Sequence, residues 1–385
     1  MGLEVVQDYE GGDAARETMN GTASGVDLGL GAVLVTGGAG YVGAHTCKAL
    51  HRVGYVPIVI DNLSTGHESF VRWGPLINAD VRDTDAVAHA INSHNVGAVL
   101  HFAASAAVGE SVINPQKYYE NNVDGALSLL RAMLRTGCRK IGFSSSCAVY
   151  GEPSEMPIRE DIPKAPVNPY GASKAMIERV LDDFARAYEL HFIALRYFNA
   201  CGADPAGEIG ELREPETHLI PRAMMALQGH VADFAVFGTD YATPDGTPIR
   251  DYVHVCDLAD AHVASVGRLL QGGASGIYNL GTGDGYSVKQ VLDAIRAQTG
   301  EELKVEMGPR RPGDPPVLVA DATLAKRDLN FEPVLSDLKS VVATAWAWHR
   351  HAHPKQAKAA SARSSRSEEV PKNGAAGREL DLQPE

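Results

Sequence analysis

At 385 residues and a net charge of -13, the chain is long enough for one large α/β unit or two domains, and its acidity argues against non-specific nucleic-acid binding. Its five cysteines are scattered without metal-ligand spacing, its first residues are acidic where a signal peptide is apolar, and no stretch reaches the roughly 18 apolar residues of a membrane span. We therefore predict a cytoplasmic protein without a metal, nucleic-acid or membrane partner, in which a few local arginines bind any anionic ligand.

Two polar ends, 1–30 and 354–385, lack apolar periodicity and are predicted to be disordered. In 31–199, short apolar runs alternate with helical patterns, which predicts an α/β fold with a doubly wound parallel sheet of the Rossmann type. In 200–350, longer loops interrupt this rhythm, and we predict a smaller mixed α/β domain that binds the substrate. Part of this later chain is expected to return to the first domain. Strands are predicted at 32–37, 56–61, 98–104, 140–146 and 192–198, and helices at 85–93, 118–135, 176–188, 219–228, 257–270, 288–298 and 335–348.

A glycine-rich turn joins the first predicted strand to a helix. Gly37, Gly40 and Gly43 are spaced three apart in "VTGGAGYVGAH". Glycine at these positions permits a tight turn and a close approach of the backbone to a pyrophosphate, which a helix N-terminus attracts. The second strand ends at Asp61, at the distance expected for a carboxylate that accepts both hydroxyls of a ribose and repels a 2′-phosphate. We therefore predict that the first domain binds NAD rather than NADP.

Two further segments predict the chemical centre. The strand "KIGFSSS" ends at Ser146, and ligands of open α/β sheets bind at the carboxyl ends of strands. A turn with local hydrogen bonds is the alternative explanation for any one of these serines. In "NPYGASK", Pro169 places Tyr170 in the first turn of a helix and Lys174 one turn later. A cation beside an oxidised nicotinamide would lower the tyrosine pKa and make it a usable base, whereas the spacing alone also fits an exposed helix pair.

The three features occur in this order in the extended short-chain dehydrogenase/reductase superfamily, which the chain resembles. The motifs "TGGAGYVG", "DNLSTGH", "YYENNV", "FSSSCAVYG", "NPYGASK", "LRYFNACGADP", "DGTPIRDYVHVCDLADAHV", "YNLGTG" and "PRRPGD" are similar to those of the UDP-glucose 4-epimerase family. This resemblance runs from about residue 32 to about residue 348. It implies that the protein interconverts two UDP-sugars, UDP-glucose and UDP-galactose, by reversible epimerisation at C4. The reaction would pass through a 4-keto intermediate and use NAD as the cofactor. It also implies a homodimer, for which 118–135 and 176–188 are the candidate contact helices; packing of their apolar faces inside the monomer is the alternative.

The resemblance assigns roles to individual side chains. Tyr170 would be the acid/base, Lys174 would lower its pKa and bind the nicotinamide ribose, and Ser146 would bind the 4-oxygen. The residues expected around NAD are Gly37, Gly40, Tyr41, Val42, Gly43, Asp61, Asn62, Asp80, Val81, Phe102, Ala103, Asn121, Lys174 and Tyr197. Those expected around the UDP-sugar are Ser146, Tyr170, Asn199, His218, Leu219, Phe237 at the uridine, Arg250 and Arg311 on the diphosphate, Asp314 on the ribose, and Leu318. For Asp80, the N-cap of the next helix is an alternative.

Some positions differ from the patterns of related families. Ala106 stands where well-studied members have a lysine, and His218 replaces an asparagine. Leu318 occupies a position where members differ between a bulky aromatic and a small residue, and its intermediate size disfavours N-acetylated sugars. A 4,6-dehydratase needs an adjacent acidic pair after the site hydroxyl, where this chain has Cys147 and Ala148. Elimination of water is therefore disfavoured.

Two alternatives remain from the sequence. A UDP-arabinose/UDP-xylose 4-epimerase carries motifs similar to "SSSCAVYGEP" and "PRRPGD" and would use the same chemistry, since nothing happens at C6. A non-catalytic dinucleotide-sensing protein would keep the fold and the glycine turn. The retention of Ser146, Tyr170 and Lys174 disfavours the second alternative.

Overall fold

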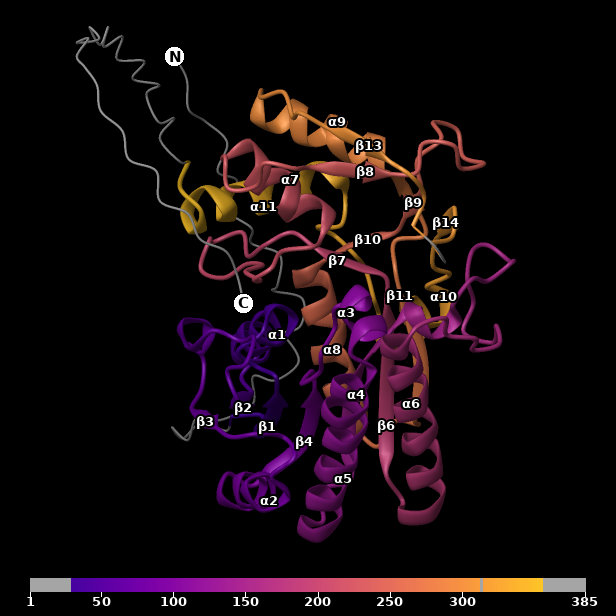
Figure 1. Ribbon diagram of the computed structural model, residues 1–385. Helices are drawn as coiled ribbons and strands as arrows, with labels where there is room; N and C mark the ends of the chain where they lie inside the picture. Colours follow the sequence, from indigo (N-terminus) through magenta and orange to yellow (C-terminus); the bar gives the residue numbers. More distant parts are fainter. Residues whose placement is uncertain (1–28, 312–313, 356–385) are drawn as a thin grey trace, which may run out of the picture.

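The computed structural model describes residues 29–311 and 314–355. The ends predicted to be disordered, 1–30 and 354–385, lie almost entirely outside these residues. Figure 1 shows a layer of parallel strands with long helices beside it, and a smaller group of helices and short strands above it. Among the described residues, no helix is long and apolar enough to cross a membrane.

In the described part of the chain, seven parallel strands form the main sheet, in the order β11-β6-β5-β4-β1-β2-β3. All five predicted strands belong to it, and the predicted fold class is confirmed. The order of the chain reverses between β1 and β4, and ligands of open α/β sheets bind at such a switch point. The strands are β1 (Ala32–Thr36), β2 (Val56–Asp61), β3 (Leu76–Asn78), β4 (Val96–His101), β5 (Lys140–Ser146), β6 (His191–Tyr197) and β11 (Gly276–Leu280).

Helices cover both faces of this sheet (Figure 1). Successive side chains of a strand point to opposite faces, so Val33 and Val35 of β1 pack in one apolar cluster and Leu34 packs in another. The first cluster contains residues of α1 (Tyr41–Arg52) and α8 (Val255–Leu270). The second contains residues of α2 (Thr84–Ser93), α5 (Gly125–Thr136) and α6 (Pro169–Tyr188). Both α8 and β11 come from the later part of the chain: β11 is an edge strand of the main sheet, and α8 packs against one of its faces.

The smaller group has its own apolar core, formed by α7 (Leu219–Leu227), α9 (Val288–Thr299) and α11 (Leu338–Ala352) around short strands. The predicted helix from residue 335 begins at Leu338, because the Asp337 side chain caps it at Ser340 N. The other elements are β7 (Asn199–Cys201), β8 (Ala235–Phe237), β9 (Ile249–Arg250), β10 (Tyr252–His254), β12 (Tyr286–Ser287), β13 (Glu306–Gly308), β14 (Val317–Leu318), α3 (Val108–Ile113), α4 (Pro115–Tyr118), α10 (Thr323–Leu329) and the short helices η2 (Glu68–Phe70), η3 (Tyr119–Asp124) and η4 (Cys147–Tyr150).

The helical stretch predicted over 118–135 is present, but part of it is a π-helical turn rather than α-helix. The segment is divided into the end of α4, a π-helical turn η3 and then α5. The wider π turn carries Asn122, which is fully buried and hydrogen-bonded to two other segments. A regular helical turn is the default for such a sequence, whereas π turns are rare and occur often at functional sites.

Candidate active site

The predicted glycine turn joins β1 to α1. Gly37 has φ +73, and a Cβ atom there would lie 2.6 Å from the Ala103 backbone nitrogen. At Gly43, a Cβ atom would lie 2.2 Å from the Gly37 carbonyl oxygen. Gly40 is the N-cap of α1 and offers no side chain to its first N–H groups. These N–H groups remain available to an anion at the position where a pyrophosphate is expected.

Asp61 lies at the end of β2, next to this turn. Its Oδ2 accepts a hydrogen bond of 3.0 Å from Ala39 N, and its Oδ1 accepts one of 2.9 Å from Leu63 N. Burial raises the pKa of Asp61, while the two N–H groups oppose this effect. The carboxylate is therefore held in one orientation beside the glycine turn, as a ribose diol requires.

The predicted adenine end is built around Asp80. Asn62 Nδ2 donates to Asp80 Oδ2 at 3.0 Å, and Arg82 makes two hydrogen bonds of 2.9 and 2.8 Å to the same carboxylate. The Arg82 hydrogen bonds hold the pKa of Asp80 well below its usual range. Asp80 is not the N-cap of α2, because Asp83 takes that position. Val81 is buried in the adjacent core.

The remaining cofactor-side predictions lie at the carboxyl edge of the sheet. Phe102 and Ala103 follow β4, and their N–H groups donate to the Thr36 carbonyl at 2.9 and 3.1 Å. Tyr197 ends β6 and its hydroxyl is hydrogen-bonded to Ser144 of β5. In α1, Tyr41 is buried and donates to the Gly202 carbonyl at 2.6 Å, and Val42 is partly buried.

Asn122, which the sequence did not predict, lies next to the predicted Asn121. Asn121 Nδ2 donates to Asn122 Oδ1 at 3.1 Å. Asn122 Oδ1 also accepts from Ser105 N at 2.8 Å, and its Nδ2 donates to Ser105 O at 3.1 Å and to Ser173 Oγ at 3.0 Å. Ser173 immediately precedes Lys174 on α6. The buried amide therefore fixes the loop after β4 against the helix that carries the predicted catalytic pair.

Ser146, Tyr170 and Lys174 meet at the carboxyl end of β5. The Asn168 side chain caps α6 with a 2.8 Å hydrogen bond to its first turn, which places Tyr170 in that turn and Lys174 one turn later. The Ser146 side chain acts on the Tyr170 hydroxyl and lowers its pKa. Lys174 Nζ lies 5.8 Å from the centroid of the Tyr170 ring and donates to the Ser144 carbonyl at 2.7 Å.

Burial dominates the acid–base properties of this pair. Burial raises the pKa of Tyr170, and the Ser146 hydrogen bond and the charge of Arg213 act in the opposite direction. Burial lowers the pKa of Lys174 to about 7, although the Glu178 carboxylate opposes this shift. The expected lowering of the Tyr170 pKa by Lys174 stays a prediction, because Ser146 and Arg213 are the groups that lower it here.

A buried charged network, also not predicted, supports this centre. Glu178 lies one turn after Lys174 and accepts hydrogen bonds of 2.8 and 2.6 Å from Nε and Nη2 of Arg196. Ser145 Oγ donates to the same carboxylate at 2.6 Å. Arg196 Nη1 donates to the Tyr150 hydroxyl at 2.7 Å. The network joins β5, β6 and α6 directly beneath the three predicted catalytic side chains.

The predicted nucleotide side contains two contacting groups. The Arg311 guanidinium lies 4.5 Å from the centroid of the Phe237 ring. Arg250 is ion-paired with Asp314, and it is aligned with Leu318 across the β9 and β14 pairing. Two guanidinium groups and an aromatic ring are suited to a nucleoside diphosphate, because the planar fork binds phosphate oxygens in pairs.

The other substrate-side predictions lie at the ends of elements. Asn199 begins β7, His218 is the N-cap of α7, and Leu219 is the first residue of α7. Burial raises the pKa of Cys147 to about 12, and the charge of Arg250 opposes this shift. The Arg250 guanidinium therefore acts on the residue next to Ser146. The nucleotide side and the chemical centre are therefore close enough to interact.

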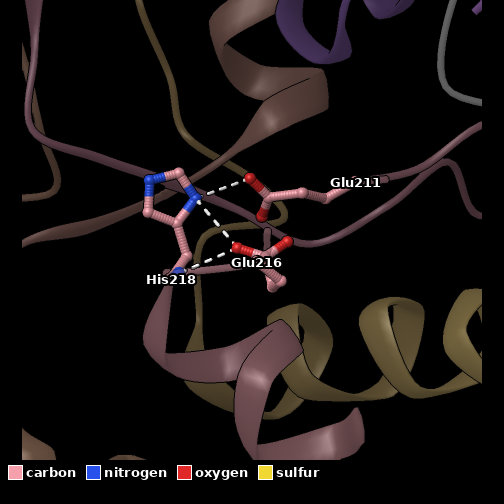
Figure 2. Close-up of side chains that lie close together, drawn as sticks. All are labelled: Glu211, Glu216 and His218. Atoms are coloured by element: carbon pink, nitrogen blue, oxygen red, sulfur yellow. Dashed lines mark hydrogen bonds and ion pairs between the residues drawn. The ribbon is translucent and has the colours of Figure 1, made fainter. Parts of the chain in front are cut away.

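The loop before α7 carries a cluster of charges that no motif predicted. Figure 2 shows Glu211, Glu216 and His218 facing one another, with ligand atoms within 4.8 Å of one another. His218 Nδ1 lies 2.6 Å from Glu211 Oε1, which also accepts from Arg213 Nε at 2.9 Å. Glu216 accepts from the backbone N–H of His218 at 2.8 Å. Both carboxylates thus have partners within the chain, and the absence of a metal stays a prediction.

Comparisons with known proteins agree with this geometry. Residues 33–281 match the model of the NAD dependent epimerase/dehydratase family. The chain is 50% identical over 317 residues to the UDP-glucose 4-epimerase of Rhizobium meliloti, a match that covers 82% of this chain and 96% of that one.

Two solved structures are similar over most of the chain. The UDP-glucose 4-epimerase from Brucella ovis in complex with NAD has a TM-score of 0.81 and 52% identity, covering 82% of this chain and 97% of its own. The Stenotrophomonas maltophila UDP-glucose-4-epimerase with bound NAD and formylated UDP-arabinopyranose has a TM-score of 0.81 and 38% identity, covering 84% and 98%. By both the family model and these relatives, the chain belongs to the NAD dependent epimerase/dehydratase family.

Proposed function

We propose that this protein interconverts UDP-glucose and UDP-galactose by NAD-dependent inversion at C4 of the sugar. The observation that carries the proposal is the meeting of Ser146, Tyr170 and Lys174 at the carboxyl end of β5, beside the sheet's switch point. The relative of 50% identity, which is matched over nearly its whole length, carries the name of this activity.

NAD fits the residues at the glycine turn. Gly37 and Gly43 leave no room for a Cβ atom, so the backbone itself lines the position of a pyrophosphate. The fixed Asp61 carboxylate accepts hydrogen bonds from a ribose diol and repels the 2′-phosphate of NADP. NAD held there would supply the acceptor for the hydride of C4 and the donor that restores it on the other face of the 4-keto sugar.

The protein side chains manage the proton. Tyr170 removes the proton of the 4-hydroxyl, and Ser146, which lowers the pKa of Tyr170, holds the 4-oxygen in reach of the phenolate. Lys174 stabilises the phenolate by its charge and would donate to the nicotinamide ribose. Tyr170 gives the proton back when the 4-hydroxyl is restored on the opposite face, so one residue is base and then acid.

The substrate is held by its nucleotide rather than by its sugar. Phe237 would stack on the uracil, Arg250 and Arg311 would bind the diphosphate, and Asp314 would accept from the ribose. A sugar that must present both of its faces to the same cofactor has to turn between the two half-reactions. Binding through the nucleotide leaves it free to do so.

The test is the reaction itself. Purified protein incubated with UDP-galactose, without added NAD, should produce UDP-glucose, detected by chromatography of the nucleotide sugars. Tyr170→Phe should keep UDP binding and lose about 100-fold to 10,000-fold in turnover. Tyr188→Phe, at the exposed end of the same helix, is the matched control and should retain wild-type turnover. A Tyr170→Phe enzyme with turnover near wild type would remove Tyr170 from this role.

A second candidate is a UDP-arabinose/UDP-xylose 4-epimerase. It is favoured by the similar Stenotrophomonas maltophila structure, which holds a formylated UDP-arabinopyranose. The two candidates differ in the value of kcat/KM for UDP-galactose relative to UDP-arabinose. A ratio below one assigns the pentose as the preferred substrate. UDP-N-acetylgalactosamine in the same assay tests whether Leu318 excludes an acetamido group.

We further propose the homodimer that packs through 118–135 and 176–188, which lie mainly in η3, α5 and α6; η3 and α6 contact each other in the fold. The support is exposed apolar side chains in these two segments: Tyr119 is 37% exposed and Met176 46%. Sedimentation should give twice the chain mass, and Met176→Glu should give the monomer. A cytoplasmic location belongs to the same proposal, since all five cysteines are free thiols.

A further inference from the structure

The Tyr241 side chain lies after β8, between two segments of the predicted nucleotide side. Its backbone N–H donates to the Gly246 carbonyl at 2.9 Å, which closes the turn that carries it. Gly238, directly after β8, has φ +79, and a Cβ atom there would lie 2.3 Å from the Tyr241 ring. The Arg310 guanidinium lies 4.4 Å from the centroid of the same ring, and Arg310 Nε donates to Asp240 Oδ1 at 2.7 Å. The ring is therefore held in one position by Gly238 and Arg310.

The Tyr241 hydroxyl is buried and has no hydrogen-bond partner among the described residues. The whole residue is only 5% exposed. Other buried tyrosines have partners, since Tyr150 donates to Asn279 at 2.7 Å and Tyr118 donates to Glu110 at 2.9 Å. A buried hydroxyl without a partner costs free energy, because it has given up its hydrogen bonds to water and gained none. Such a group in a folded protein needs an explanation.

Charged side chains surround this hydroxyl. Burial raises the pKa of Tyr241, and among the charges Asp314 has the largest effect, in the same direction. Asp240 also raises this pKa, whereas Arg250 and Arg310 lower it. With a pKa above its usual value of about 10, the phenol is neutral near pH 7 and is available as a hydrogen-bond donor. The carboxylate that acts on it most strongly, Asp314, is an acceptor.

In this structure Asp314 is paired with Arg250. The proposed function gives these two side chains different partners, because Arg250 would bind the diphosphate and Asp314 the ribose. A phosphate that takes the Arg250 guanidinium removes a donor from the Asp314 carboxylate. An ionised carboxylate has about four acceptor positions, so it can accept from ribose hydroxyls and from a protein donor together. Tyr241 is a buried donor without a partner that lies within the electrostatic reach of Asp314.

We propose that the Tyr241 hydroxyl donates to the Asp314 carboxylate when the nucleotide binds, and so orients this carboxylate toward the ribose. The inference rests on the proposed function. Tyr241 is then a positioning residue that acts through Asp314. The cost of its unpaired hydroxyl is recovered on binding, so the hydroxyl contributes to the affinity for the nucleotide and not to the stability of the fold.

The first test measures binding and turnover. Tyr241→Phe removes only the hydroxyl, and we expect the Kd of UDP, from calorimetry, and the KM for UDP-galactose to rise about tenfold. The value of kcat should stay near that of the wild type, because the hydroxyl contributes equally to binding of the substrate and of the transition state. Tyr188→Phe, whose side chain is 49% exposed, is the control and should bind UDP as the wild type does.

A double-mutant cycle tests whether the effect passes through Asp314. In the Asp314→Ala background, Tyr241→Phe should change the Kd of UDP by less than about twofold, because the acceptor of its hydroxyl is already gone. A full tenfold loss in that background would overturn the inference, since the hydroxyl would then bind the nucleotide without Asp314.

The second test does not depend on activity. Without UDP, Tyr241→Phe should melt about 2 °C above the wild type, because a buried unpaired hydroxyl is removed, and saturating UDP should abolish this gain. Tyr118→Phe, which loses a paired hydroxyl, should melt below the wild type. If Tyr241→Phe melts below the wild type and binds UDP as tightly, the hydroxyl is only structural and the inference is wrong. Lack of any C4 inversion by the wild type would instead refute the proposed function.

Discussion

Arg196→Met tests the buried network of Glu178 and Arg196 next to the predicted catalytic side chains. The change removes the guanidinium that makes two hydrogen bonds to Glu178 and leaves a carboxylate with no exposed side-chain surface. Breaking a buried pair by removing one partner costs about 3–5 kcal/mol, because the remaining charge stays buried. Lys164 Nζ remains 3.1 Å from Glu178 but is partly exposed, which favours the lower end of this range.

The loss converts into a measurable change in melting temperature. For a folded part of roughly 325 residues, an unfolding entropy of about 2 cal/mol/K per residue gives about 1.5 °C per kcal/mol. We therefore expect Arg196→Met to melt roughly 4–8 °C below the wild type, measured by circular dichroism at saturating NAD. Arg179→Met on the same helix breaks an exposed pair with Asp183 and should leave the melting temperature unchanged.

The difference in melting temperature between the wild type and Arg196→Met should depend on pH in a defined direction. Burial opposes the ionisation of Glu178 in the wild type, but Arg196 outweighs it and the net pKa is lowered, so the carboxylate stabilises the fold above its unfolded pKa of about 4.3. Without Arg196, burial raises the pKa of Glu178. The loss of stability caused by the unpaired carboxylate disappears once the pH falls below that raised pKa, because Glu178 is then neutral. The gap between the two proteins should thus be largest at pH 7 and smaller at pH 5.

Two outcomes would refute this reasoning. A loss of less than 2 °C at pH 7 would mean that the pair does not contribute as a buried ion pair. Equal melting temperatures for Arg196→Met and for the double variant Arg196→Met with Glu178→Gln would mean that the unpaired carboxylate is not the source of the loss. We expect the double variant to regain most of the stability.

Three further predictions concern the cofactor side. Gly43→Ala places a Cβ atom 2.2 Å from the Gly37 carbonyl oxygen and should abolish the NAD content of the purified protein, read from its ultraviolet spectrum; an unchanged content contradicts it. Asp61→Ala should raise the affinity for NADP relative to NAD by about tenfold, equivalent to roughly 1.4 kcal/mol, in a competition assay, and an unchanged ratio would count against the ribose role. Burial lowers the pKa of Lys174 to about 7, so the buried charge destabilises the fold most below pH 7 and progressively less as the pH rises toward its unfolded value of about 10.4. Lys174→Met should therefore lose turnover. Its melting temperature should exceed that of the wild type, and the increase should be larger at pH 6 than at pH 9. Equal increases at the two pH values would show that burial of the charge is not the cause.

The sequence predicts the features whose cause is local. Apolar runs and their spacing predict the five strands, and the glycine turn is readable because a Cβ atom at Gly37 or Gly43 would collide with the backbone. Ser146, Tyr170 and Lys174 can be proposed from the sequence because each lies in a short motif at the end of a strand or the start of a helix. These are features that neighbouring residues alone determine.

The unpredicted parts depend on distant partners. Asn122 is hydrogen-bonded to Ser173, 51 positions later, and Glu178 to Arg196, 18 positions later. A buried polar side chain looks like an exposed one in the sequence until its partner is known. The π turn has the same local sequence pattern as an ordinary α-helix, so the sequence does not reveal the π turn before α5.

The position of β11 at the edge of the main sheet has a consequence for synthesis. β11 pairs with β6 in a register that joins Gly276 to Ile193, which lies 83 positions earlier in the chain. Until the ribosome has delivered β11, the completed strand β6 presents an unpaired edge of backbone N–H and C=O groups, which invites pairing with other chains. A chain that stops after residue 199 should therefore aggregate rather than fold as an independent cofactor domain. The two halves are parts of one folding unit, and a nascent chain is most in need of chaperone protection in the interval between them.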